Sequence, residues 1–323
     1  MHSISQLQAI LNQAITDSQY PEHPKELYEP ITYLMDLGGK RLRPVSLLMA
    51  CNLFSNDVST AIKPALAIEV FHNFTLMHDD IMDNAPLRRG KQTVHSKWNN
   101  NVAILAGDVM LVEAYKLIMQ VEPSILPTVL SIFNETAVGV CEGQQIDMNF
   151  ESLHDVEEAE YINMIRLKTA VLLAAALKIG SLIGGASQTD ANLLYDFGIN
   201  LGLAFQLHDD ILDVYGDPEK FGKQVGGDIL ANKKTFMLIK ALESAPEETQ
   251  RSIRHWLTVD DTPLEKVTAM TSLYDQLQVK ELAEAKMADF AEKALHCLEL
   301  VKVEPARKEI LKAFATSLSS REH

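Results

Sequence analysis

The sequence predicts an all-α fold. Apolar residues recur at i, i+3 and i+4 over long segments, which is the spacing of one face of a helix. Alternating apolar and polar runs, which are typical of half-buried strands, are not evident. The 323 residues include only 15 glycines and 12 prolines, and so few turn-forming residues favour long helices. Apolar residues make up 47% of the chain, which is enough for a sizeable core.

The first part of the chain contains five segments with helical periodicity, and three of them stop at a turn signal. Helices are predicted for residues 5–16, 25–36, 42–54, 61–82 and 101–120. The turn signals that separate or end these helices are Asp36-Leu37-Gly38-Gly39, Asn84-Ala85-Pro86 and Glu122-Pro123.

The second part of the chain continues in the same way. Helices are predicted for residues 125–142, 158–184, 188–215, 233–243 and, with breaks, 263–316. Gly184-Gly185 and Gly216-Asp217-Pro218 end two of them, and the polar stretch 143–157 is predicted to be a loop. Because no linker rich in Pro, Gly or Ser divides the chain, we expect a single helical domain over residues 1–323.

The overall charge excludes several classes of partner. With 29 basic and 44 acidic residues, the formal net charge is −15, a poor match for nucleic acid or an anionic membrane surface. The three cysteines, Cys51, Cys141 and Cys297, are too widely spaced for a disulfide or CxxC pattern, and we expect buried thiols. No secretory signal and no run of 18 apolar residues is present. We therefore expect a soluble, cytoplasmic protein without a membrane span.

One short acidic pattern occurs twice. It reads His78-Asp79-Asp80-Ile81-Met82-Asp83 and, 130 residues later, His208-Asp209-Asp210-Ile211-Leu212-Asp213. Since residues i and i+4 share a helix face, the first and last aspartates of each copy would lie side by side. Such carboxylates repel each other and oppose the dipole at a helix C-terminus, so folding alone does not favour them. Mg²⁺ does, because it binds carboxylate oxygens and completes its coordination with water and substrate phosphates.

Basic residues accompany these acidic clusters. The first cluster is followed by Leu87-Arg88-Arg89-Gly90-Lys91, and the second by Lys223-Gln224-Val225-Gly226-Gly227-Asp228 and Asn232-Lys233-Lys234. Earlier lies Gly38-Gly39-Lys40-Arg41-Leu42-Arg43-Pro44, in which the glycines let the backbone approach a ligand. Arginine and lysine beside metal-binding carboxylates indicate a polyphosphate substrate.

In their order and spacing, these motifs resemble the trans-type isoprenyl diphosphate synthases, also called polyprenyl synthetases. The resemblance runs from about residue 38 to about residue 235, and residues 240–323 carry little of it. The motifs are GGKRLRP (38–44), HNFTLMHDDIMD (72–83), LRRG (87–90), AILAGD (103–108), EGQQIDM (142–148), KTA (168–170), FQLHDDILD (205–213) and FGKQVGGDI (221–229).

The resemblance implies the all-α isoprenoid synthase type I fold, a helical bundle around a deep central cavity, and a homodimer. It implies a prenyltransferase that condenses isopentenyl diphosphate head-to-tail with dimethylallyl, geranyl or farnesyl diphosphate. The implied cofactor is Mg²⁺, as three ions for which Mn²⁺ can substitute, which would neutralise the diphosphate leaving group. Ionisation, condensation and proton elimination require no Ser/His/Asp triad.

The resemblance also assigns roles by position in the motifs. The implied metal ligands are Asp79, Asp80, Asp83, Asp209, Asp210 and Asp213. The implied substrate-binding residues are Arg88 for the allylic diphosphate, and Lys40, Arg43, His72 and Arg89 for isopentenyl diphosphate. The residues implied to hold the reacting allylic diphosphate and stabilise the cation are Lys168, Thr169, Gln206, Lys223 and Lys233. Gln144 and Asp147 lie in a further motif without an assigned role.

Side chains before Asp79 are the candidates for setting product length. Phe74 and Phe71 are five and eight residues upstream, about 7.5 Å and 12 Å along a helix axis, and the small Thr75 is four upstream. An aromatic residue only at the fifth position resembles archaeal-type geranylgeranyl diphosphate synthases. We therefore expect a C20 product, with C15, the product of a farnesyl diphosphate synthase, as the alternative if Phe71 also narrows the tunnel.

Three other functions remain as alternatives. A class I terpene cyclase would share the fold, but its second metal motif normally mixes Asn or Asp, Ser or Thr, and Glu. A metal phosphohydrolase would use His78-Asp79 and needs further histidine ligands. A non-enzymatic, regulatory subunit of a prenyl synthase would typically lack one aspartate cluster, whereas both are intact here.

Overall fold

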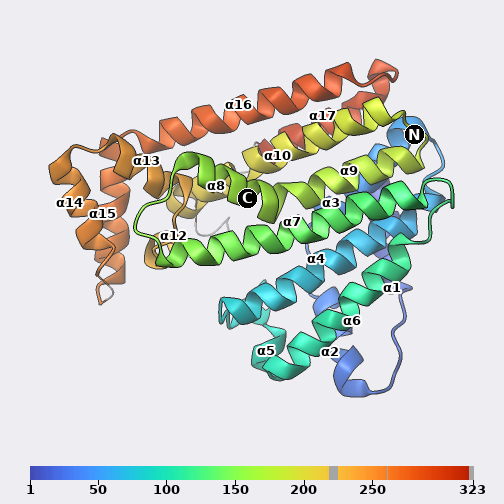
Figure 1. The fold of residues 1–323 in the computed structure, drawn as a ribbon, viewed down its shortest axis with the longest axis horizontal. Helices are drawn as coiled ribbons and strands as arrows, with labels where there is room; N and C mark the ends of the chain where they lie inside the picture. The colour runs from blue at the N-terminus through green and yellow to red at the C-terminus, as the bar shows by residue number, and fades with distance from the viewer. Residues whose placement is uncertain (218–224, 260, 320–323) are drawn as a thin grey trace. The chain divides into compact units, whose positions relative to one another are not determined.

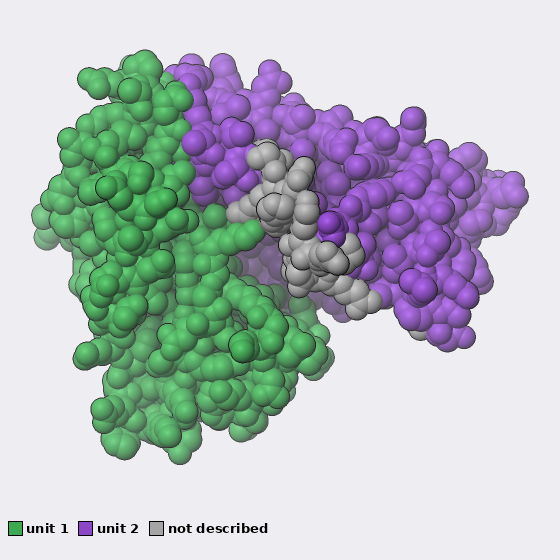
Figure 2. Space-filling view, turned by 180° about the vertical axis from the view of Figure 1, so that it is seen from behind, with its two compact units in different colours: residues 1–134, 175–194, 302–310 green, residues 135–174, 195–301, 311–323 purple. Residues whose placement is uncertain are grey.

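The computed structural model describes residues 1–217, 225–259 and 261–319. The chain divides into two compact units, which are coloured green and purple in Figure 2. Unit 1 comprises residues 1–134, 175–194 and 302–310, and unit 2 comprises residues 135–174, 195–301 and 311–323. Each unit is assembled from three stretches of the chain, and the single domain expected over residues 1–323 stays a prediction.

Unit 1 contains most of the N-terminal helices and a short hairpin (Figure 1). In chain order its elements are α1 (Ile4–Thr16), α2 (Lys25–Asp36), α3 (Leu42–Phe54), the 3₁₀ helix η1 (Ser59–Ala61), α4 (Ile62–Met82), β1 (Leu87–Arg88), β2 (Lys91–Gln92), α5 (Val94–Lys97) and α6 (Asn100–Ile118). Four helices have residues in both units, namely α7 (Leu126–Ser152), α9 (Val171–Ile183), α10 (Gln188–Tyr215) and α17 (Pro305–Ser319).

The core of unit 1 forms around α3 and α4. Both helices are apolar on nearly every face, which is typical of a helix enclosed by its neighbours. The helices α1, α2 and α6 pack against α4 and cover it, and α6 runs alongside α4 in Figure 1. The start of α1 is fixed by a capping box, in which Ser3 Oγ accepts from the Gln6 amide and Gln6 Oε1 accepts from the Ser3 amide.

The basic run after α4 forms a β-hairpin. Leu87 pairs with Gln92 and Arg88 with Lys91 in antiparallel register. The two residues between them, Arg89 and Gly90, have φ values of 53° and 73°, and positive φ at both positions defines a type I′ turn. Adjacent arginines are thereby placed differently, Arg88 on a strand and Arg89 in the turn.

Unit 2 is also helical. The elements that lie wholly within it are α8 (Glu158–Ile165), a π-helical turn η2 (Arg166–Ala170), α12 (Gly227–Leu230), α13 (Phe236–Ser244), α14 (Glu247–Trp256), α15 (Pro263–Gln276) and α16 (Val279–Leu300). Its core is one cluster of buried apolar side chains from these helices, from α7 and from α10, including Tyr161, Leu207, Phe236 and Met270.

Most helices agree with the sequence-based predictions, but α5, α12 and α14 were not predicted, and two further differences concern α7 and the segment 158–184. The all-α class is confirmed, the hairpin being the exception among the described residues, and the predicted bounds of α3 and α10 match. The loop predicted at 143–157 is wrong for residues 143–152, because α7 continues to Ser152. Ile146 and the buried Phe150 lie one turn apart and pack into the core of unit 2, which is enough to hold an otherwise polar helix.

The second difference is that the helix predicted over 158–184 is interrupted by the π-helical turn at Arg166–Ala170. The expectation of three buried cysteines is confirmed for Cys51 and wrong for Cys141, which is exposed on α7, and Cys297 on α16 is partly exposed. Within the described ranges, no helix has the length and apolar character needed to span a lipid bilayer.

Candidate functional site

The first aspartate cluster lies at the C-terminal end of α4 in unit 1. Asp80 is buried, Asp79 is partly exposed, and Asp83 is exposed at the helix C-cap. Arg88 of the hairpin binds Asp80, with its Nε 2.9 Å from both carboxylate oxygens and its Nη2 2.6 Å from Oδ1. Burial raises the pKa of Asp80, and the Arg88 guanidinium opposes this rise. The middle aspartate of the motif is therefore held by an arginine, and the outer two remain more open.

The second arginine of the hairpin packs on the glycine pair before α3. Arg89 donates to the carbonyl of Gly38, and a Cβ added to Gly39 would lie 2.8 Å from the Arg89 guanidinium carbon. Gly39 also has φ +132°, so only glycine suits both the backbone and the arginine that covers it. The two glycines thus act as the surface on which Arg89 rests.

His72 and Arg43 form a second basic group in unit 1. Arg43 Nη1 lies 3.2 Å from His72 Nε2, and because a guanidinium has no acceptor, this ring nitrogen accepts the hydrogen bond. Burial, followed by the positive charges of Arg43, Arg89, Arg88 and Arg41, holds the pKa of His72 well below its usual range. Lys40 is exposed just before this group.

A buried ion pair beneath these residues was not expected from the sequence. Arg41, which has φ +48°, pairs with Glu69 of α4 and donates to the carbonyl of Met35 at the end of α2. Asn73 Nδ2 in turn donates to Glu69 Oε1 at 2.7 Å. The sequence did contain a signal for this pair, because Glu69 lies within an otherwise apolar helical segment and a carboxylate buried there needs a partner. Arg41, the N-cap of α3, thereby ties the loop residue Lys40 and the first turn of α3, which carries Arg43, to α2 and α4.

The candidate chain-length residues belong to an aromatic cluster in unit 1. The ring centroids of Phe71 and Phe74 are 5.6 Å apart, and those of Phe71 and Phe133 are 5.2 Å apart. Phe71 is 1% exposed and Phe74 is 9% exposed, so Phe74 is the more open of the two. Thr75 Oγ1 donates to the His72 carbonyl at 2.8 Å, one turn back on α4.

The second aspartate cluster lines a cavity of about 190 Å³ in unit 2. The sequence-predicted residues that line it are Lys168, Thr169, Gln206, Asp209, Asp210, Asp213 and Lys233. Lys223 lies outside the described residues. The cavity is also lined by residues to which the motifs gave no role, namely Asp147, Tyr161, Asp228, Lys234 and Thr235. The cavity therefore brings together carboxylates, ammonium groups and neutral polar side chains.

Asp210 is buried and held by neutral donors. It accepts hydrogen bonds from the hydroxyl of Tyr161, from Gln206 Nε2 at 3.2 Å and from the Phe236 amide at 3.4 Å. Burial raises the pKa of Asp210 to about 8, against the opposing effect of these hydrogen bonds. Tyr161 is buried and its pKa is well above the usual range, so it remains a donor. Tyr161 was missed because no motif includes it.

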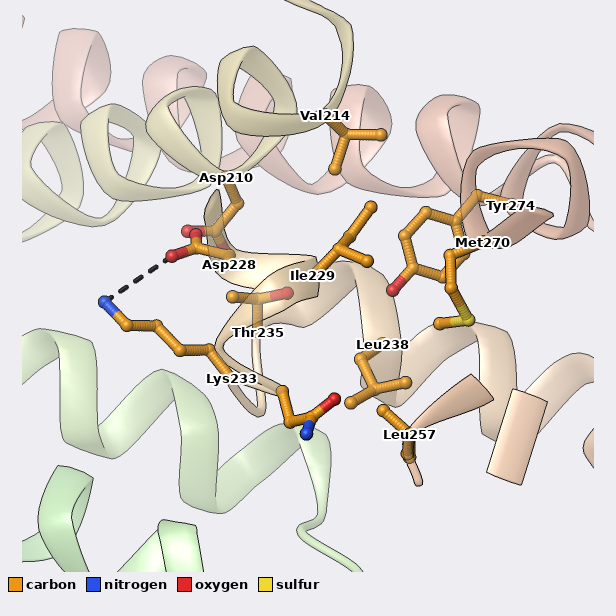
Figure 3. A pocket seen from close by; sticks show the side chains of 11 residues that line it. Asp210, Val214, Asp228, Ile229, Lys233, Thr235, Leu238, Leu257, Met270 and Tyr274 are labelled. Carbon is orange, nitrogen blue, oxygen red and sulfur yellow. Dashed lines mark ion pairs between the residues drawn. The ribbon is translucent and has the colours of Figure 1, made fainter. Parts of the chain in front are cut away.

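The last aspartate of the second motif is bound to α12. Asp213 Oδ2 accepts from the Asp228 amide at 2.9 Å, and the Asp213 carbonyl accepts from the Gly226 amide at 2.6 Å. Lys233, beyond the other end of α12, pairs with Asp228 at 3.5 Å. Figure 3 shows the Lys233 and Asp228 side chains directed toward each other, near Asp210.

Close packing explains how the π-helical turn presents Lys168 and Thr169. A Cβ on Gly143 of α7 would lie 2.3 Å from the Lys168 amide nitrogen, and one on Gly202 of α10 would lie 2.7 Å from the Ala170 Cα. The wider turn thus fits between two glycines. Lys168 then reaches Asp147 at 2.6 Å, and Thr169 Oγ1 donates to Gln206 Oε1 at 3.2 Å.

The carboxylates fit a hard divalent cation. Among the described residues, no group of three or more His, Cys, Asp or Glu side chains is arranged to enclose a metal ion. Mg²⁺ does not need such a cage, because it usually takes one or two carboxylates and fills its octahedron with water and substrate phosphates. The outer aspartates of each unit have the hard oxygen atoms that Mg²⁺ would need.

We predict that acidification destabilises the protein through His72. Since the folded pKa lies below the unfolded value of about 6.5, the unfolded chain binds more protons there, and stability falls as the pH drops below about 6.5. Between pH 7.5 and 5.5, circular dichroism should show a smaller loss of Tm for His72→Gln than for the unaltered protein. His255→Gln, at an exposed histidine, is the control and should match the unaltered protein. Equal losses for His72→Gln and the control would contradict the prediction.

Comparison with known proteins agrees with the fold and the motifs. The profile of the family described as Polyprenyl synthetase matches residues 24–276, a range that includes parts of both units. A short chain isoprenyl diphosphate synthase from Methanothermobacter thermautotrophicus is 39% identical over 93% of this chain and 92% of its own length.

Solved structures give the same result. A geranylgeranyl pyrophosphate synthase matches with a TM-score of 0.95 and 41% identity, over all of both chains. A polyprenyl synthase from Caulobacter crescentus, solved with calcium and isoprenyl diphosphate, matches with a TM-score of 0.88 and 29% identity, over 99% of this chain and 96% of that one. The chain belongs to the polyprenyl synthetase family of prenyltransferases.

Proposed function

We propose that the protein condenses isopentenyl diphosphate head-to-tail with an allylic diphosphate and releases a C20 product, geranylgeranyl diphosphate. The observation that carries this proposal is the cavity of unit 2. Its carboxylates suit a metal-bound diphosphate, and Lys168 and Lys233 suit the phosphate oxygens. Thr169 and Gln206 are neutral, and their dipoles would stabilise an allylic cation. Because they carry no negative charge, they would not react with the cation to form an adduct.

The basic groups of unit 1 suit the second substrate. Arg89 on its glycine support, together with Lys40, Arg43 and His72, would bind the diphosphate of isopentenyl diphosphate. Arg88, anchored on Asp80, would contact the allylic diphosphate. A neutral His72 fits this role, since its Nδ1–H is a donor while Nε2 accepts from Arg43.

The family is generally Mg²⁺-dependent. We propose that the ligands come from the outer aspartates, Asp79 and Asp83 in unit 1 and Asp209 and Asp213 in unit 2, with three ions in all and Mn²⁺ as a substitute. Bound Mg²⁺ would neutralise the diphosphate leaving group. Asp80 and Asp210 would contribute less, because both oxygens of each carboxylate already accept hydrogen bonds from the protein, whereas Asp213 accepts such a bond at Oδ2. We also propose that both units form one functional domain and that the protein is cytoplasmic.

For product length, we propose that Phe74 is the floor beneath the growing chain. Phe74 is nearer to Asp79 than Phe71 along α4 and is the more open of the two rings. Phe71 is fully enclosed and packs on Phe133, so it would lie behind this floor. Thr75 is small and its hydroxyl is bonded within α4, which leaves room beside Phe74 and favours C20 over C15.

A homodimer is proposed from the surface of α6 and its C-cap residue, Met119. Leu105, Val112 and Met119 recur every seven residues and are 58%, 58% and 45% exposed. Residues at this spacing form a stripe along one side of a helix, as in a coiled-coil seam. Large apolar side chains exposed along one side of a helix are typical of an interface. A second copy of this chain is the proposed occupant, since two-fold pairs are the commonest oligomers.

The function is tested by incubating the purified protein with Mg²⁺, isopentenyl diphosphate and each allylic diphosphate in turn, then sizing the dephosphorylated products by mass. A C20 alcohol that requires isopentenyl diphosphate is the expected result. A C15 limit would replace the C20 assignment. A cyclic hydrocarbon, phosphate release alone, or no turnover would instead indicate a cyclase, a phosphohydrolase or a regulatory subunit.

In the same assay, Asp79→Asn/Asp83→Asn and Asp209→Asn/Asp213→Asn should each lower turnover about 1,000-fold or more, because the leaving group loses its metal ligands. The Tm should hold or rise, since repulsion between neighbouring carboxylates is removed. Asp289→Asn, at an exposed aspartate paired with Lys293, is the control and should keep full turnover. Turnover that survived in either double variant would contradict the metal assignment.

Phe74→Ala should lengthen the product by at least one isoprene unit, because it removes the floor. Phe71→Ala alone should leave the C20 product, and Phe74→Ala/Phe71→Ala should extend it further than Phe74→Ala. Leu66→Ala, at a buried residue near the other end of α4, is the control for helix destabilisation and should keep C20. An unchanged C20 product in Phe74→Ala would refute the floor.

Leu105→Glu/Val112→Glu should convert the protein from a dimer to a monomer in sedimentation velocity, since charges would enter the proposed seam. Leu264→Glu, at a leucine of α15 that is 79% exposed, should remain dimeric. If the double variant remained a dimer, the interface would not lie on α6. If the unaltered protein were a monomer, the homodimer proposal would be wrong.

A further inference from the structure

Lys266 is a buried lysine with no role in the proposed chemistry. It lies in α15, outside the part of the chain that carries the motifs, and only 1% of the residue is exposed. Its ammonium donates to Asn232 Oδ1 at 2.8 Å and to the Val259 carbonyl at 3.0 Å. A buried ammonium lowers stability unless such bonds compensate for its lost hydration.

The contact with Asn232 fixes the turn at the end of α12. Asn232 has φ +54°, its amide donates to the Ile229 carbonyl, and the Lys233 amide donates to the Asp228 carbonyl. These two hydrogen bonds and the left-handed conformation of Asn232 form a Schellman motif, in which glycine usually takes the left-handed position. Here asparagine takes that position, and its side-chain oxygen is held by Lys266.

The turn determines where the next residues point. Lys233, Lys234 and Thr235 follow it and line the cavity of unit 2. At the opposite end of α12, the Asp228 amide binds Asp213 of the second motif. The short α12 segment therefore connects an aspartate of the cluster with the lysine that faces it.

A second contact from α15 holds the start of the same segment. A Cβ on Gly226, just before α12, would lie 2.7 Å from the side chain of Val267, the residue next to Lys266. Figure 3 shows Met270 and Tyr274 of α15 close to Ile229 and Leu238, on the side of the loop away from Lys233. These apolar contacts would hold α15 against the segment without a charged group. The Lys266 ammonium adds what a hydrocarbon side chain could not supply, a hydrogen bond to the side chain of Asn232.

We propose that Lys266 is a positioning residue for the diphosphate end of the allylic substrate. It acts through Asn232, whose left-handed turn aims Lys233 into the cavity, and it does not touch the substrate. The inference rests on the proposed function for the identity of the substrate. Lys266 would thereby control the affinity of the unit 2 cavity for a diphosphate.

The test compares Lys266→Met, which keeps the length of the side chain and removes the donor, with Lys240→Met. Lys240 is a partly buried lysine of the same unit that pairs with Glu158 and Glu243. Steady-state kinetics would use geranyl diphosphate and isopentenyl diphosphate with Mg²⁺. Lys266→Met should raise the KM for geranyl diphosphate about tenfold, because a displaced Lys233 would lose a hydrogen bond to the charged diphosphate. The KM for isopentenyl diphosphate should change by no more than about twofold.

Two further variants separate positioning from stability. Asn232→Asp keeps the acceptor and tolerates the left-handed turn, so it should stay close to the unaltered protein. Asn232→Gly/Lys266→Met should be no worse than Lys266→Met, because both changes break the same contact. Lys240→Met should lower the Tm and leave both KM values unchanged. A Lys266→Met protein with a lower Tm and unchanged KM values would overturn the proposal.

Calorimetry with geranyl diphosphate and Mg²⁺, without isopentenyl diphosphate, keeps this result separate from the proposed function. About tenfold weaker binding by Lys266→Met than by the unaltered protein supports the inference even if condensation is never observed. Equal binding overturns it even if condensation proceeds. If the unaltered protein bound no geranyl diphosphate, both the inference and the proposed function would fail.

Discussion

Burial of one carboxylate at each of two helix ends is the constraint on which the candidate sites depend. In each motif the middle aspartate points into the protein, where an uncompensated charge is expensive. In unit 1 a cation compensates for this burial, because the Arg88 guanidinium donates to both carboxylate oxygens of Asp80. Unit 2 uses neutral donors, and the consequence is an Asp210 carboxyl whose pKa lies near 8. The same local pattern is thus stabilised in two chemically different ways.

Much of this architecture could be predicted from the sequence, because it depends on local patterns. Apolar residues recur with helical spacing through α3, α4 and α10, and short polar or glycine-containing turns separate these helices from their neighbours, so periodicity gave their positions. The aspartates, arginines and lysines were found because their motifs are contiguous and recur. Their clustering within each unit follows from helical spacing, as with Gln206, Asp209 and Asp213 around one cavity.

What could not be predicted depends on partners that are distant in the sequence. Tyr161 on Asp210, Glu69 beneath Arg41 and Lys266 on Asn232 are single residues outside any functional motif or without a marked role in one. The C-terminal turns of α7 were missed because Ile146 and Phe150 are the apolar side chains that pack into the core there, and two such residues are too few to register as periodicity. The π-helical turn depends on glycines in two other helices.

The π-helical turn also has a consequence for how the chain tolerates insertions and deletions. A π turn holds one residue more than an α-helical turn, and each residue of a helix is rotated by about 100° from the one before it. Removing any single residue between Arg166 and Ala170 would restore a continuous α-helix from α8 into α9. It would also rotate α8, with Tyr161, by about a quarter turn relative to α9. A one-residue deletion that improves the helix would therefore dismantle the hydrogen bond on Asp210, and functional chains should keep the irregular turn.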